Sequence, residues 1–221
     1  MKAMILAAGR GERMRPLTDH TPKPLLQVAG QSLLVWHLRA LAEAGFKEVV
    51  INHAYLGEQI EQALGDGSTW GLRIQYSPEG QALETAGGIA NALHLLGEEA
   101  FLVVNGDVFA QIDFSMIRLM PPNMAHLLMV PNPVQHPQGD FCLQDGKVVQ
   151  HGNAMLTFSG VGIYHPHLFA HIKPGESAKL APILRSAMDK GLVSGERFDG
   201  VWHDIGTPER LAEINRLMQR T

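Results

Sequence analysis

Short apolar runs alternate with segments of helical periodicity through the first half of the chain. This alternation is the feature that most restricts which folds the chain can adopt. We expect four strands, at Ala3–Ala7, Lys47–Asn52, Leu72–Tyr76 and Phe101–Val104, and between them three helices, at Ser32–Ala44, Tyr55–Leu64 and Thr85–Leu95. Strands that are apolar throughout are typical of a sheet buried on both faces, and helical connections make consecutive strands parallel. The pattern therefore predicts an α/β fold.

The second half of the chain has a different pattern. We expect a strand at His126–Val130, a hairpin over Phe141–Val149 that turns at Asp145-Gly146, an antiparallel strand at Leu156–Tyr164, an amphipathic helix at Lys179–Lys190 and a last helix that begins at Thr207-Pro208-Glu209. No linker, repeat or composition break separates the two halves. We therefore predict one domain over residues 1–221, built on a mixed sheet.

The composition excludes several classes of protein. The net charge of −4 argues against a general nucleic-acid surface, and no apolar run is long enough to span a bilayer. The N-terminus lacks the cleavage region of a signal peptide. The chain has a single cysteine, Cys142, so no disulfide can form within it. These features predict a cytoplasmic protein that binds neither nucleic acid nor membrane; a monomer is compatible with the sequence, which leaves the oligomeric state open.

A glycine-rich loop after the first strand carries four cations, Arg10, Arg13, Arg15 and Lys23, on this mildly acidic chain. It is neither a dinucleotide fingerprint, because Met14 replaces the third glycine, nor a P-loop, because it lacks the Gly-Lys-Ser/Thr ending. Glycine lets backbone N–H groups approach an anion, and arginine and lysine bind phosphate oxygens. Ligands gather at the carboxyl ends of such strands. The loop therefore predicts a phosphate site.

The stretch LAAGRGERMRPLTDHTPKPLL resembles the signature of the sugar-1-phosphate nucleotidylyltransferases, a GxGxR motif followed by a Pro-Lys pair. The resemblance implies a Rossmann-like, doubly wound, mainly parallel sheet with a small antiparallel acceptor lobe. It also implies two small-molecule substrates, a nucleoside triphosphate bound by residues 1–110 and a sugar 1-phosphate bound by residues 111–221. On this resemblance the triphosphate would be held by Ala8, Gly9, Gly11, Glu12 and Arg13, with Lys23 neutralising its phosphates.

Two aspartates complete the expected catalytic set. Asp107 follows the strand in FLVVNGDVF, and Asp204 precedes a helix in VWHDIGTPERL. Mg²⁺ in phosphoryl-transfer sites is held by one or two carboxylates together with phosphate oxygens. The resemblance implies that the two aspartates share Mg²⁺ and act with Arg13 and Lys23. No protein base is needed, because a sugar 1-phosphate is already ionised at neutral pH.

The base and sugar sites are less well defined. QYSPEGQALETAGGI resembles the base-reading turn of the family, which implies nucleotide contacts from Glu79, Gly80 and Thr85. Glu84 stands where the family usually has glycine. This stretch does not identify which base is bound. For the sugar phosphate we expect Asn105, Gly139, Asp140 and Asn153. The Glu-Lys-Pro triplet of many relatives is absent, so we expect Lys179 or Arg185 to supply the missing cation.

Within the family, the chain is similar enough to mannose-1-phosphate guanylyltransferases and other sugar-1-phosphate nucleotidylyltransferases that these stay open as alternatives. Two functions of other kinds are considered as well. A catalytically silent nucleotide- or sugar-sensing subunit would tolerate loss of the cations and the metal aspartates, which are all present. A cytidylyltransferase acting on a phosphorylated alcohol such as phosphocholine would need an aromatic cage for the ammonium group, and no aromatic cluster is seen. We interpret the histidines in YHPHLFAH as packing or surface residues, because no cysteine or carboxylate completes a zinc set.

Overall fold

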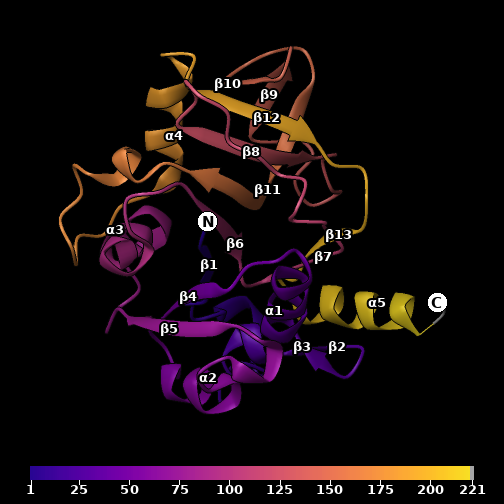
Figure 1. Cartoon of the computed structure of the whole chain (residues 1–221). Coiled ribbons are helices and arrows are strands. Elements are labelled where there is room, and N and C mark those ends of the chain that lie inside the picture. The colour runs from indigo at the N-terminus through magenta and orange to yellow at the C-terminus, as the bar shows by residue number, and fades with distance from the viewer. Residues whose placement is uncertain (220–221) are drawn as a thin grey trace.

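A nine-stranded mixed sheet runs through the protein, in the order β5-β4-β1-β6-β11-β8-β12-β10-β9 (Figure 1). Its strands are β1 (Ala3–Leu6), β4 (Glu48–His53), β5 (Arg73–Pro78), β6 (Phe101–Asn105), β8 (Ala125–Val130), β9 (Phe141–Gln144), β10 (Lys147–Val149), β11 (Met155–Tyr164) and β12 (Val193–Arg197). This computed structural model describes residues 1–219, and the last two residues of the predicted domain, 220 and 221, lie outside the described residues.

The first four strands of the sheet are parallel, as the alternation in the sequence predicts. β1 pairs with β4 and β6, and β4 pairs with β5. The connecting helices are α1 (Leu33–Glu43), α2 (Gly57–Leu64) and α3 (Glu84–Leu96), and α4 (Leu180–Met188) follows later in the chain. Ile5 and Ile51 pack in one cluster with α1 and α2, whereas Met4 and Val50 pack in another with α3 and α4. Helices therefore cover both faces of the sheet.

The second half of the sheet closes on itself. β11 is antiparallel to both β6 and β8, whereas β8 and β12 are parallel to each other. The β9–β10 hairpin turns at Asp145 and Gly146, both with positive φ, which confirms the predicted Asp-Gly turn. β9 also pairs with the start of β11, so the strands β11, β8, β12, β10 and β9 form a ring. The predicted antiparallel lobe is therefore a mixed one.

The last helix, α5 (Pro208–Met218), lies at the right edge of the molecule in Figure 1. Thr207 accepts a hydrogen bond from the backbone N–H of Arg210, and Pro208 opens the helix, as predicted. Ile214 packs in a small third cluster with Phe109 and Ile205. This cluster fixes α5 against the segments that carry the two aspartates.

Short elements that periodicity did not predict connect these parts. They are the ribbon of β7 (Val108–Ala110) with β13 (Trp202–Asp204), the ribbon of β2 (Gln27–Val28) with β3 (Gln31–Ser32), and the 3₁₀ turns η1 (Glu12–Met14), η2 (Lys23–Leu25), η3 (Ser68–Trp70) and η4 (Pro166–Phe169). Two- and three-residue strands are too short to show an alternating pattern. Within residues 1–219, the helices lack the length and apolar character needed to cross a membrane.

Candidate active site

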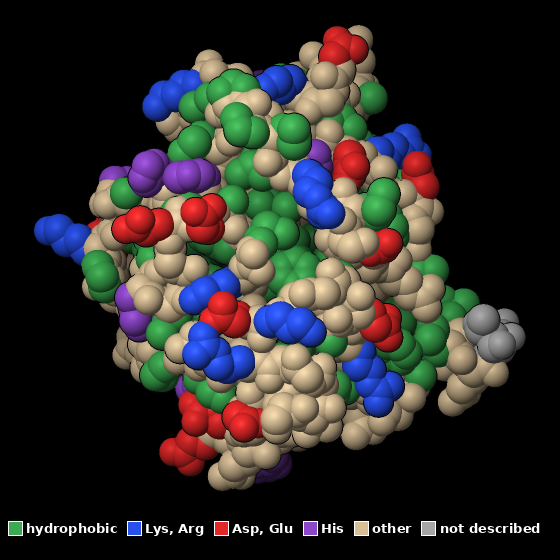
Figure 2. All heavy atoms as spheres, in the orientation of Figure 1, with side chains coloured by type: hydrophobic (Ala, Val, Ile, Leu, Met, Phe, Trp, Pro, Cys, Tyr) green, Lys and Arg blue, Asp and Glu red, His purple; other side chains and the backbone are tan. Residues whose placement is uncertain are grey.

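A cavity of about 380 Å³ lies at the carboxyl ends of β1, β4 and β6, where the topology predicts a ligand. Figure 2 shows a hollow at the centre of one face of the molecule, with hydrophobic side chains in its floor and charged side chains along its lower rim. The cavity is lined by Leu6, Ala7, Ala8, Gly9, Lys23, Pro24, Asn52, Glu79, Ala82, Glu84, Thr85, Asn105 and Asp107. Seven of the predicted site residues are therefore brought together.

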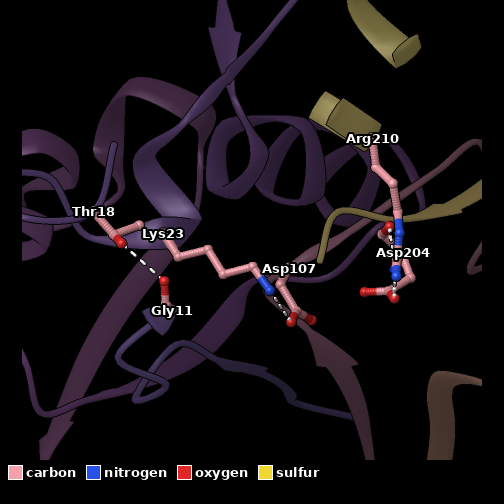
Figure 3. A network of polar contacts seen from close by, with 6 residues as sticks. All are labelled: Gly11, Thr18, Lys23, Asp107, Asp204 and Arg210. Atoms are coloured by element: carbon pink, nitrogen blue, oxygen red, sulfur yellow. Dashed lines mark hydrogen bonds and ion pairs between the residues drawn. The ribbon is translucent and has the colours of Figure 1, made fainter. Parts of the chain in front are cut away.

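The glycine-rich loop folds back onto Lys23. Gly11 has a φ of 69°, and a Cβ atom there would lie 2.9 Å from the Cβ of Lys23. The hydroxyl of Thr18 donates a hydrogen bond of 2.8 Å to the carbonyl of Gly11 (Figure 3). Glycine is needed at this position both for its backbone conformation and for the close approach of the lysine. The loop thus places a lysine that is only 7% exposed in the cavity wall.

Lys23 forms an ion pair with Asp107 across the cavity. Its Nζ lies 2.6 Å from Oδ2 of Asp107, which sits in the turn between β6 and β7 (Figure 3). The turn is tight: the N–H of Gly106 donates to the carbonyl of Leu6, and a Cβ at Gly106 would lie 2.7 Å from that oxygen. The turn therefore rests directly on the end of β1, which sets Asp107 beside the glycine-rich loop.

The β7–β13 ribbon brings Asp204 next to Asp107. Asp204 pairs with Val108 in the ribbon, and the N–H of Ile205 donates to the carbonyl of Asp107 at 3.0 Å. Arg210, from the first turn of α5, forms an ion pair with Asp204 (Figure 3). A second cavity, of about 470 Å³, has Asp204 and Arg210 in its wall. The two aspartates thus lie at the same end of the ribbon but in the walls of two cavities.

The donor set fits a divalent cation. Two carboxylates, one from the turn before β7 and one from β13, are each paired with a cation of the protein. Carboxylate oxygens are the ligands that Mg²⁺ takes together with phosphate oxygens. Over residues 1–219 there is no group of three or more His, Cys, Asp or Glu side chains arranged to hold a metal. A metal at this ribbon would therefore take its remaining ligands from substrate and water.

Several predicted residues lie outside the first cavity wall. These are Gly11, Glu12, Arg13, Gly80, Gly139, Asp140, Asn153 and Asp204. Glu12, Arg13, Gly80 and Asn153 are exposed.

Asp140 joins its loop to β11: one carboxylate oxygen accepts from the N–H of Phe158 in β11 at 2.8 Å, and the other lies 3.1 Å from Nε2 of His136 in the loop. Gly139, in the same loop, has a φ of 66° and packs against the side chain of Asn132. Both residues therefore shape the loop after β8.

Lys179 and Arg185, the expected replacement cations, are both exposed, at and beyond the start of α4. Figure 1 shows α4 at the upper left, on the opposite side of the molecule from α5. Neither residue lines the cavities at Asp107 or Asp204. The cation that the structure places beside an expected metal aspartate is instead Arg210.

Asn52 also lines the first cavity, and the sequence did not lead us to expect it there. It is 2% exposed, accepts from the N–H of Ala7 at 2.9 Å, and donates to Oε1 of Glu79 at 2.6 Å. The other oxygen of Glu79 accepts from the N–H of Leu83. Asn52 therefore ties the glycine-rich loop to the turn that resembles the base-reading segment. A polar residue near the end of an apolar parallel strand, as in VVINH, is the signal that could have identified it.

The backbone of Glu84 has a conformation that glycine adopts more readily than glutamate does. Its φ is 61°, in the left-handed region that disfavours side chains. We expect Glu84→Gly to raise the free energy of unfolding by about 1 kcal/mol, because it relieves this strain. Urea unfolding measures the change. Gln62→Gly, in ordinary helical backbone of α2, should shift stability by about 1 kcal/mol in the opposite direction, and loss of stability in both variants would contradict the assignment.

His37 lies buried beneath the turn that carries Asp107. Burial lowers its pKa to about 4, although the nearby charge of Asp107 and the backbone of Val108 and Asn105 oppose the shift. The unfolded chain therefore binds more protons as the pH falls from 6.5 to 4, so the contribution of neutral His37 is complete above pH 6.5 and is lost towards pH 4.

We expect this residue to account for a loss of about 3 kcal/mol of stability over that range. Urea unfolding at a series of pH values, comparing wild type with His37→Leu, measures the difference in slope. His171→Gln, at an exposed position, should keep the wild-type slope. Equal slopes for wild type and His37→Leu would contradict the prediction.

Comparison with known proteins places these features in a family. Residues 2–139 match the nucleotidyl transferase family model. The chain is 58% identical to N-acetylmuramate alpha-1-phosphate uridylyltransferase from Neisseria meningitidis, over 98% of both proteins, and 35% identical to the enzyme of that name from Caulobacter vibrioides, over 98% of this chain and 97% of the relative. HddC from Yersinia pseudotuberculosis, solved with GMP-PN, has the same fold, with a TM-score of 0.80 at 20% identity over 98% of this chain and 99% of that one. The chain therefore belongs to the nucleotidyl transferase family.

Proposed function

We propose that the protein is an N-acetylmuramate α-1-phosphate uridylyltransferase. It joins UTP to N-acetylmuramate α-1-phosphate, releases pyrophosphate, and forms UDP-N-acetylmuramate for peptidoglycan recycling in the cytoplasm. The single observation that carries the proposal is the 58% identity, over 98% of both chains, to a relative of that name. The Lys23–Asp107 pair, placed in a cavity beside Asp204, supports a phosphate-transfer reaction at this position.

The two halves of the chain divide the substrates between them. The Rossmann-like half, residues 1–110, supplies most of the first cavity wall, and we assign the triphosphate to it. In that cavity we assign Glu79 and Thr85 to the nucleoside, and Ala8, Gly9 and Lys23 to the phosphates. Gly11, Glu12, Arg13 and Gly80 complete the proposed nucleotide site from the rim. Residues 111–221 bind the sugar phosphate through Gly139, Asp140 and Asn153, and Asn105, from the first half of the chain, is the fourth proposed contact.

The protein contributes positioning and positive charge to the reaction. A phosphate oxygen of the sugar 1-phosphate attacks the α-phosphorus of UTP as the bond to pyrophosphate breaks, so no proton has to be removed from the nucleophile. Lys23 and Arg13 stabilise charge on the triphosphate oxygens. Asp107 and Asp204 would hold Mg²⁺, which would supply positive charge to the phosphate oxygens.

The test is pyrophosphate release with Mg²⁺, in which UTP, GTP, CTP and dTTP are each combined with several sugar 1-phosphates. Turnover confined to UTP with N-acetylmuramate α-1-phosphate supports the proposal. The chain is also 40% identical, over 115 residues that make up 52% of its length, to mannose-1-phosphate guanylyltransferase from Mycobacterium tuberculosis. Best turnover with GTP and mannose 1-phosphate would therefore replace the proposed substrates, and nucleotide binding without turnover would favour a silent sensor.

A further inference from the structure

Tyr55, in the connection between β4 and α2, contacts the glycine-rich loop at two points. We propose that Tyr55 is a positioning residue for the nucleoside triphosphate, because it holds the loop on both sides of residues 11–13, which belong to the proposed nucleotide site. This inference rests on the proposed function and adds to it a residue outside the cavity wall. It also gives Arg10 a role other than phosphate binding.

The two contacts use different parts of the tyrosine side chain. The guanidinium carbon of Arg10 lies 4.8 Å from the centre of the Tyr55 ring, within the range of a cation–π interaction. The hydroxyl of Tyr55 donates a hydrogen bond of 2.8 Å to the backbone carbonyl of Asp19. One side chain therefore joins the segment before residues 11–13 to the segment after them.

Strand pairing brings Tyr55 to the loop. β1 and β4 are parallel neighbours, with Leu6 opposite Asn52, so the chain leaves both strands at the same edge of the sheet. A Cβ atom at Gly57 would collide with the ring of His53, so glycine lets the start of α2 pack directly onto the end of β4. The short connection between β4 and α2 therefore stands beside the glycine-rich loop, where Tyr55 is half-buried.

Other contacts fix the end of the loop that Tyr55 reaches through its hydroxyl. The amide of Gln59, in the first turn of α2, donates to the backbone carbonyl of His20 at 3.1 Å. The side chains of Arg15 and Asp19 form an ion pair of 3.1 Å within the loop. Tyr55 is the residue of this group that also reaches Arg10, and it thereby couples the two ends of the loop.

These contacts leave one arginine of the loop for the substrate. Arg10 lies over the Tyr55 ring, and Arg15 is paired with Asp19. Arg13 is exposed and makes no ion pair with any residue from 1 to 219. Neither Tyr55 nor Arg10 lines the first cavity. Tyr55 therefore acts through the loop that carries Arg13 and not by touching the substrate.

The test measures the Kd of UTP by calorimetric titration in the presence of Mg²⁺, and the KM of each substrate at saturating concentrations of the other. Tyr55→Leu removes both contacts and should raise the Kd and the KM of UTP about 10-fold, since a cation–π interaction and a hydrogen bond are lost together. The KM of the sugar phosphate should stay at the wild-type value, because its proposed contacts lie in other segments of the chain.

Two variants separate the contributions of the ring and the hydroxyl. Tyr55→Phe keeps the ring beneath Arg10 and loses the hydroxyl, so the Kd of UTP should rise only about 3-fold. Arg10→Gln removes the cation–π interaction and keeps the hydroxyl, so the Kd should rise less than in Tyr55→Leu. A larger increase in Arg10→Gln than in Tyr55→Leu would show that Arg10 binds the phosphates itself, and would overturn its assignment to the tyrosine.

Tyr76→Phe is the matched control, because the hydroxyl of Tyr76 donates to the backbone carbonyl of Gly65 at 2.6 Å, outside the glycine-rich loop. It should bind UTP as the wild type does. Amide hydrogen exchange over residues 10–20 does not require turnover, and it should become faster in Tyr55→Leu but not in Tyr76→Phe.

An unchanged Kd for UTP in Tyr55→Leu, equal increases in the two KM values, or unchanged exchange over residues 10–20 would overturn the inference. A wild-type protein without uridylyltransferase activity would instead contradict the proposed function, and the exchange rates would still test whether Tyr55 holds the loop.

Discussion

Replacing Asp107 by asparagine is expected to lower the turnover number by about 10²- to 10³-fold. The substitution keeps the shape of the side chain but removes the charge that pairs with Lys23 at 2.6 Å and that is proposed to hold the metal. Loss of one preorganised charge at a site of this kind typically raises the barrier by about 3–4 kcal/mol. Pyrophosphate release at saturating substrate concentrations measures the effect.

The matched control for this variant is Asp145→Asn, in the exposed turn of the β9–β10 hairpin. Asparagine tolerates the left-handed backbone of that turn as well as aspartate does, so activity and stability should both be retained. Thermal unfolding of Asp107→Asn shows whether the fold survives; the amide oxygen can still accept from Lys23. A folded Asp107→Asn protein with wild-type turnover would exclude a catalytic role for this carboxylate.

Asn52→Ala is expected to lower the free energy of unfolding by about 3 kcal/mol, since it leaves the buried N–H of Ala7 and one oxygen of Glu79 without the hydrogen bonds that they make now. For a chain of this size the melting temperature should fall by about 6–12 °C. Because Ala7 opens the glycine-rich loop and Glu79 lies in the proposed nucleoside end, the KM of UTP should rise as well. Calorimetry and steady-state assays measure the two effects.

Asn91→Ala is the corresponding control. Asn91 is half-buried on α3, and its amide donates a hydrogen bond of 3.3 Å to the hydroxyl of Ser77. This hydrogen bond joins two neutral groups, so its loss should lower stability by about 1 kcal/mol. If Asn52→Ala and Asn91→Ala melt at the same temperature, the buried hydrogen bonds of Asn52 do not contribute to stability as predicted.

The expected secondary structure follows the chain closely where local patterns are strong. Ser32 caps α1 by accepting from the N–H of Val35, and the Asp145-Gly146 turn joins β9 to β10. Both features depend on neighbouring residues alone, so local sequence is sufficient to predict them. β12 was not predicted, because it takes its place beside β8 through pairing with a segment more than sixty residues away.

Candidate site residues were likewise recognised from the sequence only where they belong to short local motifs. The GxGxR loop, Lys23 and the aspartates are short motifs, recognisable by resemblance, and seven predicted residues line one cavity. Asn52 does not belong to a recognisable motif, because its position is defined by contacts with two distant residues, Ala7 and Glu79. Arg210 appeared as an ordinary helix residue, and only the space left by Gly206 makes it a partner of Asp204.

By itself, the sequence determined the alternation of strands and helices, the caps and turns, and the family motif, because each is encoded by residues near one another along the chain. Tertiary structure alone decided that Lys23 reaches Asp107, that the β7–β13 ribbon sets Asp204 beside it, and that Arg210 rather than a cation of α4 lies at this aspartate. These contacts depend on strand register and on the packing of distant segments, which periodicity does not encode.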